Sequence, residues 1–436
     1  MLETYDDALN YIHGRQKWKK TNTFSRIARL LAELGNPQET LEYVHITGTN
    51  GKGSVAKMVN EMLATAGLRV GLFSSPFIMR FNERIQINGV PIPDADLVRI
   101  MQRVEPILAR LDAELDEGGP TEFETLTALM FVYLSEQHVD VVVLEVGIGG
   151  TWDTTNIITD KIATVITTVA YDHMHVLGNT LAEIATQKAG IIKPGRPVII
   201  GELPTEALQV IEAKTNNLVA YGKQFVTSNI RLDQTWGMTF DFSGNITVND
   251  IYLDLMGAFQ VDNAAVAIQT AVLVGQHFGH ALTVAQIRQA LAKVQWPARF
   301  ERLKTQPLLI IDGAHNQAGI QALVATLRRD FSDRHIELFF GVLADKNYSQ
   351  MLAALATLPN ANLHVVGFVA PGSREMLDPA TLIATNPEVA IQTHSTWQAG
   401  LASLPLTTDQ QAMIVMTGSL YFVSDVRQAL MHKLVD

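Results

Sequence analysis

The sequence contains no cysteine among its 436 residues. This absence excludes disulfide bonds, thiolate zinc sites and a cysteine nucleophile, and it fits a reducing compartment. Basic residues are also scarce, because 33 lysines and arginines face 44 aspartates and glutamates and leave a net charge of −11. Such a balance argues against a broad nucleic-acid-binding face. Charged residues make up only 18% of the chain and apolar residues 47%, so we expect ordered cores rather than disorder.

No uninterrupted apolar run reaches the roughly 20 residues that a membrane span needs, and residues 1–7 are acidic and polar, unlike a signal peptide. The length predicts about two or three domains. We therefore expect a soluble, cytoplasmic protein without nucleic-acid or membrane partners, and we expect it to be a monomer.

A glycine-rich loop lies between a predicted strand, residues 41–47, and a helical pattern that ends at Gly67. Backbone N–H groups of such a loop and the positive end of the following helix bind phosphate oxygens, and its lysine reaches the outer phosphates. The alternative is a tight turn that happens to contain lysine. The loop departs from the common pattern at Gly53, which separates the lysine from the serine. The predicted phosphate-binding residues are Thr49, Asn50, Gly51, Lys52, Gly53 and Ser54.

Continuous apolar strands predict an α/β fold. Segments 139–146 and 162–169 are typical of strands buried on both faces of a parallel sheet. Short strands are also predicted within 203–256. After Trp296 and Pro297 the alternation of strands and helices resumes, which predicts a P-loop ATPase domain over 1–297 and a second α/β domain over 298–436. Strands of the second domain are expected at 308–311, 336–342, 363–368 and 413–416.

Polar side chains follow three predicted strands of the first domain: Ser75, Glu145 and His173. The carboxyl ends of parallel strands meet at one edge of a sheet, where ligands bind. A buried carboxylate is costly unless it is paired, so we favour metal ligation by Glu145 over a structural ion pair. Oxygen ligands with one imidazole suit Mg²⁺ or Mn²⁺. His175 could form a chelate with His173, but we expect only His173, beside Asp172, to face the site.

Lys188 lies in a predicted helix, residues 180–192, that begins with a capping box of Thr180 and Glu183. It follows Leu181 by seven residues and so falls on the apolar face. Either the lysine extends past the helix end to solvent, or it is desolvated with a lowered pKa. In the second case the neutral amine could capture CO₂ as a carbamate, which is an anion able to bind a metal.

Two further segments have less definite interpretations. The basic cluster of Arg15, Lys17, Lys19 and Lys20 is either a solvated loop or a contact for an anionic ligand. Segment 77–85 mixes aromatic residues with cations, and we predict that it covers a ligand.

Several motifs resemble those of the folylpolyglutamate synthase family, which belongs to the ATP-dependent Mur-type ligases. They occur in the family's order and span nearly the whole chain: GTNGKGS, SSPFIMRFNERI, EVGIGGTWDTTN, AYDH, QKAGIIK, WPARFE, IDGAHN and TGSLY. The resemblance implies an N-terminal ATPase domain and a C-terminal α/β domain similar in topology to dihydrofolate reductase.

The resemblance also implies a reaction with folate and L-glutamate as substrates. ATP phosphorylates the γ-carboxylate of a folate glutamyl tail, and the amine of L-glutamate attacks the acyl phosphate to give an amide, ADP and phosphate. Two Mg²⁺ sites are implied, one at Ser75 and Glu145 and one at Glu145 and His173, with a carbamylated Lys188 beside the second.

Further roles come from the resemblance alone. Asn263 and Arg299 match nucleotide contacts near the domain joint, and Asp312 matches a contact on the ribose or phosphate side. His315 and Ser419 match residues around the incoming glutamate. Without the motifs, Arg299 could form a hinge salt bridge, and Asp312 and His315 could serve a turn or helix cap.

Other functions stay open at this point. The enzyme could also make dihydrofolate from dihydropteroate and glutamate. A cell-wall Mur ligase is less favoured, because no UDP-binding domain precedes the phosphate loop and because segment 77–85 fits the folate enzymes. A P-loop switch would not need His173 and Lys188, and a dinucleotide dehydrogenase would not carry Lys52 in its glycine loop.

Overall fold

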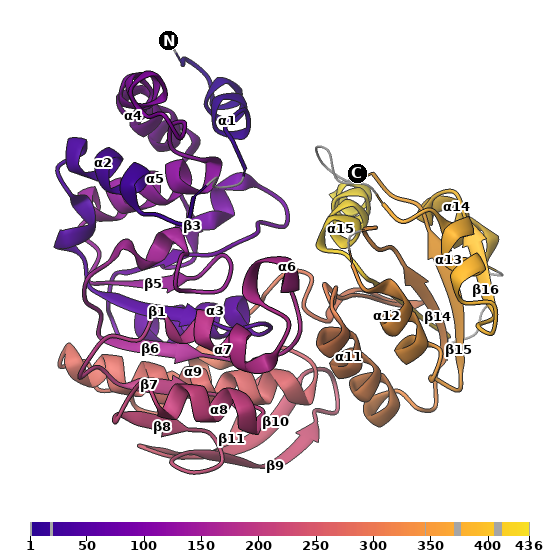
Figure 1. Cartoon of the computed structure of the whole chain (residues 1–436). Helices are drawn as coiled ribbons and strands as arrows, with labels where there is room; N and C mark the ends of the chain where they lie inside the picture. Colours follow the sequence, from indigo (N-terminus) through magenta and orange to yellow (C-terminus); the bar gives the residue numbers. More distant parts are fainter. Residues whose placement is uncertain (1, 18–20, 345, 370–375, 405–411, 436) are drawn as a thin grey trace. The chain divides into compact units, whose positions relative to one another are not determined.

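The computed structural model describes residues 2–17, 21–344, 346–369, 376–404 and 412–435. The chain divides into two compact units, drawn mostly in indigo to salmon and in orange to yellow in Figure 1. The first unit comprises Met1–Asn229, Phe240–Ile251 and Asp262–Val294, and the second comprises Ile230–Thr239, Tyr252–Val261 and Gln295–Asp436. The predicted domain boundary at 297/298 stays a prediction.

The first unit contains an eight-stranded sheet with the strand order β4-β3-β2-β5-β1-β6-β7-β8. Strands β2, β5, β1, β6, β7 and β8 pair in parallel, whereas β3 and β4 add an antiparallel edge. The predicted, mostly parallel sheet is therefore confirmed. The strands are β1 (Tyr43–Thr47), β2 (Val70–Phe73), β3 (Ile85–Ile87), β4 (Val90–Pro91), β5 (Val141–Glu145), β6 (Ala163–Ile166), β7 (Val198–Ile200) and β8 (Leu218–Ala220).

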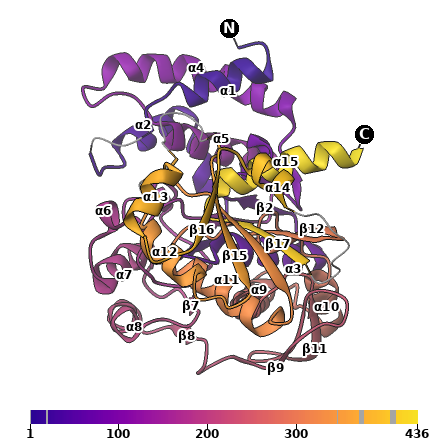
Figure 2. The same cartoon turned by 90° about the vertical axis from the view of Figure 1, so that its right-hand side faces the viewer.

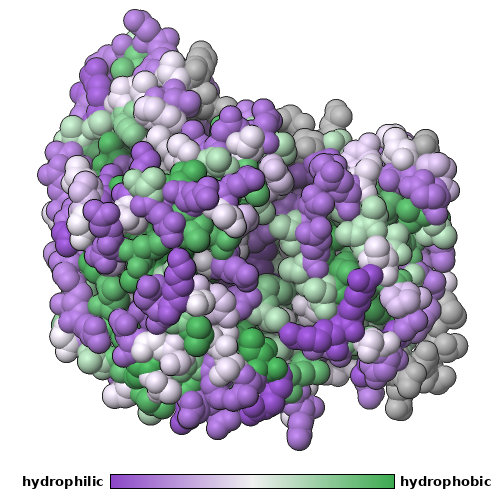
Figure 3. All heavy atoms as spheres, turned by 60° about the horizontal axis from the view of Figure 1, so that its bottom comes forward, coloured by the Kyte–Doolittle hydropathy of each residue, from purple (hydrophilic) through white to green (hydrophobic). Residues whose placement is uncertain are grey.

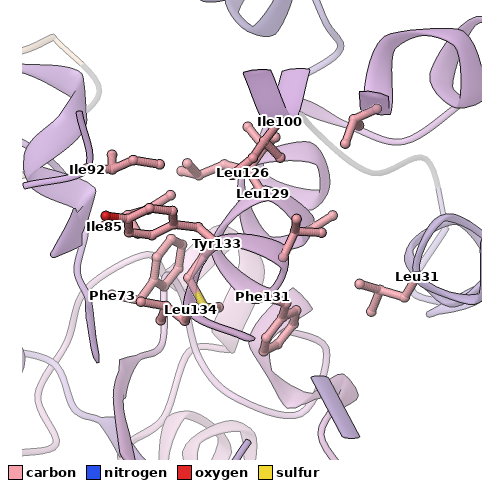
Figure 4. Packing of buried hydrophobic residues seen from close by; sticks show 14 of the residues in the cluster. Leu31, Phe73, Ile85, Ile92, Ile100, Leu126, Leu129, Phe131, Tyr133 and Leu134 are labelled. Atoms are coloured by element: carbon pink, nitrogen blue, oxygen red, sulfur yellow. The ribbon is translucent and has the colours of Figure 1, made fainter. Parts of the chain in front are cut away.

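Helices surround this sheet, and two apolar clusters fix them to it. One cluster joins α1, α2, α4 and α5 to the sheet; Figure 4 shows Tyr133 and Leu134 of α5 beside Phe73 of β2. The other packs α7 and α8 against β6 and β7 (Figure 1). Helix α5 is apolar on most of its faces and is accordingly buried along most of its length. The helices are α1 (Tyr5–His13), α2 (Ser25–Glu33), α3 (Lys52–Thr65), α4 (Asp94–Glu114), α5 (Glu122–Glu136), α6 (Met174–Leu177), α7 (Leu181–Ala189), α8 (Thr205–Glu212), α9 (Ala258–His277) and α10 (Val284–Leu291).

Three short 3-10 helices connect elements of this unit: η1 (Pro37–Thr40), η2 (Phe81–Arg84) and η3 (Thr154–Ile157). Residues 226–253 form a three-stranded sheet of β9 (Val226–Leu232), β10 (Met238–Ser243) and β11 (Thr247–Leu253), in the order β11-β10-β9.

The second unit contains a six-stranded sheet with the order β12-β13-β17-β14-β15-β16, seen in Figure 2. Only β12 is antiparallel to its neighbour, so the mixed α/β architecture is confirmed, while the closer likeness to dihydrofolate reductase stays a prediction. The elements are β12 (Glu301–Thr305), β13 (Leu308–Ile311), α11 (Gln317–Asp330), β14 (His335–Phe340), α12 (Tyr348–Leu355), β15 (Ala361–Val366), α13 (Pro379–Thr385), β16 (Ile391–His394), α14 (Trp397–Ser403), β17 (Ala412–Thr417) and α15 (Leu420–Val435).

The structure adds one helix to the sequence-based elements. The short strands predicted within 203–256 are confirmed as β8 to β11, and Thr205–Glu212 form α8, which the sequence analysis did not predict. Ala207 and Ile211 lie four residues apart and share the buried face of this helix, a spacing typical of a helix.

Helix α9 is, within the described residues, the one helix long and apolar enough to cross a membrane. However, 78% of its most apolar window is buried, so it is a core helix. On the face drawn in Figure 3, hydrophilic side chains are spread among apolar ones.

Candidate active site

The glycine-rich loop joins β1 to α3, as predicted, and Lys52 is the first residue of the helix. Gly51 has a φ of 85°, a left-handed conformation that favours glycine. A Cβ atom at this position would lie 2.3 Å from Oδ1 of Asn263, so the loop backbone packs directly on that amide. Asn263 is buried on α9. The structure thus brings Asn263 to the phosphate loop, while its contact with a nucleotide stays a prediction.

Hydroxyl groups hold this loop to the segment that follows β6. Thr49 Oγ1 donates to the carbonyl of Ala170 at 3.1 Å and accepts from the Ala170 N–H at 3.0 Å. The Asn50 N–H donates to Thr168 Oγ1 at 2.9 Å, and Thr167 Oγ1 donates to the Asn50 carbonyl at 2.5 Å. Thr49 and Asn50 therefore fix the loop's shape, and direct contact with a nucleotide stays a prediction for both.

Lys52 folds across the loop that precedes it. Its Nζ donates to the carbonyl of Gly48 at 2.9 Å and to that of Thr49 at 3.2 Å. Gly53 and Ser54, which follow it in the first turn of α3, are buried. A lysine ammonium, the loop amides and a helix N-terminus together give this place a positive potential suited to phosphate.

Lys188 lies near the end of α7 and is only 2% exposed, on the same face as Ile184 and Ala185. Burial, and next the charge of Lys52, lower the pKa of Lys188 well below its ordinary value, while Asp172 acts in the opposite direction. The predicted desolvated lysine is confirmed, and the solvent-exposed alternative is wrong. A neutral amine is the form that could react with CO₂, and carbamylation of Lys188 stays a prediction.

Ser75 and Glu145 come together as predicted, because β2 and β5 are neighbours. The Ser75 N–H donates to Glu145 Oε2 at 3.3 Å, and Glu145 is buried at the carboxyl end of β5. A serine and a carboxylate at a strand edge fit Mg²⁺, which often binds one or two carboxylates and keeps several waters.

His173 is placed differently from a strand residue. It has a φ of 48° and precedes α6, with Nε2 at 4.0 Å from Asp172 Oδ1. Its ring centroid lies 6.3 Å from that of His175. Across the described part of the chain, no group of three or more His, Asp or Glu side chains is arranged to hold a metal. The second metal site therefore stays a prediction.

In the second unit, Asp312 follows β13 and is buried. Its carboxylate accepts from the N–H groups of Phe300 at 2.8 Å and Ala314 at 2.9 Å. Burial raises the pKa of Asp312, while the amide of Ala314, the charge of Arg299 and the amide of Phe300 act to lower it. Asp312 therefore stabilises the turn after β13, which is the alternative role considered for it from the sequence.

His315 and Ser419 follow the adjacent parallel strands β13 and β17, so they lie at one edge of the second sheet. His315 Nδ1 is 2.8 Å from the Gly313 carbonyl, and the buried Ser419 Oγ accepts from the Tyr421 N–H at 3.2 Å. Their contacts with glutamate stay predictions.

The basic cluster around Arg15 and segment 77–85 both form hydrogen bonds with other residues of the first unit. Arg15 donates to Asp112 Oδ1 and to the Pro120 carbonyl, each at 2.6 Å, while Lys19 and Lys20 lie outside the described residues. Segment 77–85 contains η2 and begins β3, and Glu83 accepts backbone N–H bonds within it, from Ile78 at 2.9 Å for example. That it covers a ligand stays a prediction.

The sequence analysis missed a chain of buried, hydrogen-bonded polar side chains formed by His45, Asp153, Thr155 and Lys161. One signal was available: His45 interrupts an otherwise apolar strand. Lys161 precedes a buried strand, but nothing in its spacing connects it to His45.

Two family models match this chain. The Mur ligase middle domain matches residues 46–271, and the Mur ligase glutamate ligase domain matches residues 298–420. Over 98% of its length, the chain is 42% identical to the folylpolyglutamate synthase of Lacticaseibacillus casei, covering 99% of that protein. It is 35% identical to the dihydrofolate synthase/folylpolyglutamate synthase of Bacillus subtilis, over 99% of this chain and 100% of that one. A solved FPGS–AMPPCP–folate complex superposes with a TM-score of 0.88 at 40% identity, covering 98% of this chain and 100% of that chain.

The glycine loop, the mostly parallel sheet and the two matched models define a Mur-type, ATP-dependent ligase. Within that class, the chain belongs to the folylpolyglutamate synthase/dihydrofolate synthase family. This membership replaces the alternatives of a cell-wall ligase, a P-loop switch and a dinucleotide dehydrogenase.

Proposed function

We propose that the chain uses ATP to join L-glutamate to the γ-carboxylate of a reduced folate. A carboxylate is a poor electrophile, so phosphorylation by ATP first supplies a leaving group. The amine of glutamate then attacks the acyl phosphate, an amide forms, and ADP and phosphate leave. The observation that carries most weight is the buried Lys188, whose amine lies close enough to Lys52 of the phosphate loop to feel its charge.

Positioning and charge supply most of the rate in this proposal. The amides of Gly51, Gly53 and Ser54 and the N-terminus of α3 hold the phosphates, and Lys52 offsets the charge on the moving phosphoryl group. Asn263, packed on Gly51, keeps the nucleotide side of the loop in place.

Ser75 and Glu145 would hold one Mg²⁺, and Glu145 with His173 would serve a second. The oxygen donors and the adjacency of Ser75 and Glu145 support this assignment. Bound magnesium would neutralise charge on the transferred phosphoryl group. A carbamate on Lys188 would place an anion next to that charge, and the neutral amine favoured by burial supports it.

The glutamate-ligase domain, proposed over residues 298–436, supplies the remaining contacts. Arg299 and Asp312 would contact the nucleotide, and His315 and Ser419 would surround the incoming glutamate. The proximity of Arg299 to Asp312 and the shared sheet edge of His315 and Ser419 support these roles.

A second activity, the synthesis of dihydrofolate from dihydropteroate, is supported by the Bacillus subtilis relative, whose name carries both activities. One experiment tests both. The protein is incubated with ATP, glutamate and either tetrahydrofolate or dihydropteroate, and the product masses are measured. We expect one or more added glutamates on tetrahydrofolate, and an addition to dihydropteroate only if the enzyme is bifunctional. No glutamate addition to either compound would refute the proposed function.

We further propose a cytoplasmic monomer. The absence of cysteine supports a reducing compartment. The lack of an excess of basic residues supports the absence of a nucleic-acid partner. Light scattering at several protein concentrations gives the oligomeric state directly, and a mass twice that of the 47.9 kDa chain would refute the monomer.

A further inference from the structure

A continuous chain of buried polar side chains connects β1 to the start of η3 and to the segment before β6. Lys161 Nζ lies 2.6 Å from His45 Nδ1, and His45 Nε2 lies 2.8 Å from Thr155 Oγ1. Thr155 Oγ1 in turn bonds Asp153 Oδ1 at 2.6 Å. His45 and Thr155 are fully buried, Lys161 is 3% exposed and Asp153 is 8% exposed. The proposed reaction uses none of these four side chains directly.

The hydrogen bonds in this chain have one consistent direction. The Thr155 hydroxyl donates to Asp153 Oδ1, so its oxygen accepts from Nε2–H of His45. Neutral His45 then carries a lone pair on Nδ1, which accepts from Lys161. Burial first, and then the charges of Lys161 and Lys193, lower the pKa of His45 well below its ordinary value, in keeping with a neutral ring.

One end of this chain fixes the loop that packs on Lys188. Asp153 Oδ2 accepts the N–H of Ile148 at 2.9 Å, and the Thr151 N–H of the same loop donates to the Gln187 carbonyl at 2.8 Å. A Cβ atom at Gly150 would lie 2.7 Å from the Gln187 carbonyl oxygen and 3.0 Å from that of Lys188. The loop therefore touches the backbone of the last turn of α7.

The other end of the buried chain, Lys161, bonds the backbone that follows the last turn of α7. Lys161 Nζ donates to the carbonyl of Ile191 at 2.7 Å, and the Ile191 N–H donates to the carbonyl of Lys188 at 3.3 Å. Both ends of the buried chain thus reach the backbone around Lys188.

We propose that Lys161 and His45 are positioning residues of the ligase reaction, which hold the backbone of Lys188 so that its amine stays beside the phosphate loop. The inference rests on the proposed function of Lys188. A displacement of about 1 Å at a reacting group can cost on the order of 100-fold in rate, so fixing this backbone matters for turnover even though neither residue touches a substrate.

The test compares Lys161→Met, His45→Leu and the double variant, with Lys57→Met as the matched control. Lys57 is a partly buried lysine of the same unit that pairs with Glu61. Glutamate addition to tetrahydrofolate gives kcat and KM for ATP, and thermal unfolding gives stability. Single variants leave a buried polar partner unsatisfied, whereas removal of both partners relieves much of that cost.

We expect Lys161→Met to lower kcat about 10- to 100-fold and to change KM for ATP less than about threefold. The double variant should regain melting temperature relative to the single variants and yet keep the low kcat, because the hold on Lys188 is still missing. Lys57→Met should keep kcat within about twofold of wild type.

A folded Lys161→Met protein or double variant with wild-type kcat would overturn the positioning role. If the single variant does not fold, the double variant decides. A wild-type protein that adds no glutamate would instead refute the proposed function, so the two failures are distinguishable.

Discussion

The two sheets are built alike, but the buried ionisable side chains beside them have different roles. Each has parallel central strands and an antiparallel strand at one edge. The first unit buries the amines of Lys161 and Lys188, whose pKa values burial lowers, whereas the second buries the carboxyl of Asp312, whose pKa burial raises. Lys188 lies close to the phosphate loop, while Asp312 accepts the backbone amide of Ala314 in its own turn and that of Phe300 just before β12. The comparison separates side chains that set the chemistry from side chains that set the shape of a loop.

Removing the phosphate-loop cation should have the largest effect. Lys52→Ala is expected to lower kcat/KM for ATP about 1,000-fold or more, since no other side chain of the loop can offset phosphoryl charge. Phosphate release in the presence of folate and glutamate measures it. Lys57→Ala on the same helix, where the lysine pairs with Glu61, is the control and should retain near wild-type turnover. Equal losses in both variants would contradict the special role of Lys52.

Lys188 should come next. Lys188→Ala is expected to lower kcat about 100-fold or more, and Lys188→Arg should not restore it, because arginine stays charged and cannot form a carbamate. Assays with and without added bicarbonate measure both variants. Full activity in Lys188→Arg would remove the carbamate idea.

In the second unit, we expect a loss of stability instead. Asp312→Ala leaves the buried N–H of Phe300 and the partly buried N–H of Ala314 without their acceptor, at a cost of about 1–3 kcal/mol in the free energy of unfolding. Urea denaturation measures this cost, and Asp333→Asn on an exposed turn is the control. An unchanged unfolding free energy would show that Asp312 does not hold the turn, and the contrast between the units would weaken.

The smallest effect concerns pH. Folded His45 stays neutral because its pKa is lowered, while unfolded His45 takes up a proton below its ordinary value of 6.5. The unfolded state then binds more protons, so stability should fall as the pH drops below 6.5, by about 1.4 kcal/mol per pH unit for this group.

Urea denaturation between pH 7 and pH 5 checks this slope. His45→Gln should flatten it, whereas His138→Asn, at an exposed position with a left-handed backbone, should not. An equal slope in His45→Gln would show that another group accounts for the acid sensitivity.

Local signals in the sequence predicted much of the fold and part of the site. The capping box of Thr180 and Glu183 begins a helix in the structure, and strand 308–311 has the predicted bounds. Apolar runs predicted β5 and β6, and strand ends predicted that Ser75 and Glu145 meet.

What could not be predicted depends on contacts between distant segments. Strand β3 has only three residues, one of them Gln86, and forms because β2 offers it an edge. The bond between Lys161 and His45 joins residues 116 positions apart, and no spacing rule connects them. Roles for His315 and Ser419 could come only from the family's motifs, since the bonds of His315 to the Gly313 carbonyl and of Ser419 to the Tyr421 N–H join near neighbours in sequence and indicate no ligand.

The most direct measurement of the central claim follows an oxygen atom. If the folate γ-carboxylate is phosphorylated, one of its oxygens leaves with the phosphate when glutamate attacks. With oxygen-18 in that carboxylate, we predict one labelled oxygen in the released phosphate for each amide formed. Phosphate without the label, together with normal product, would contradict activation through an acyl phosphate.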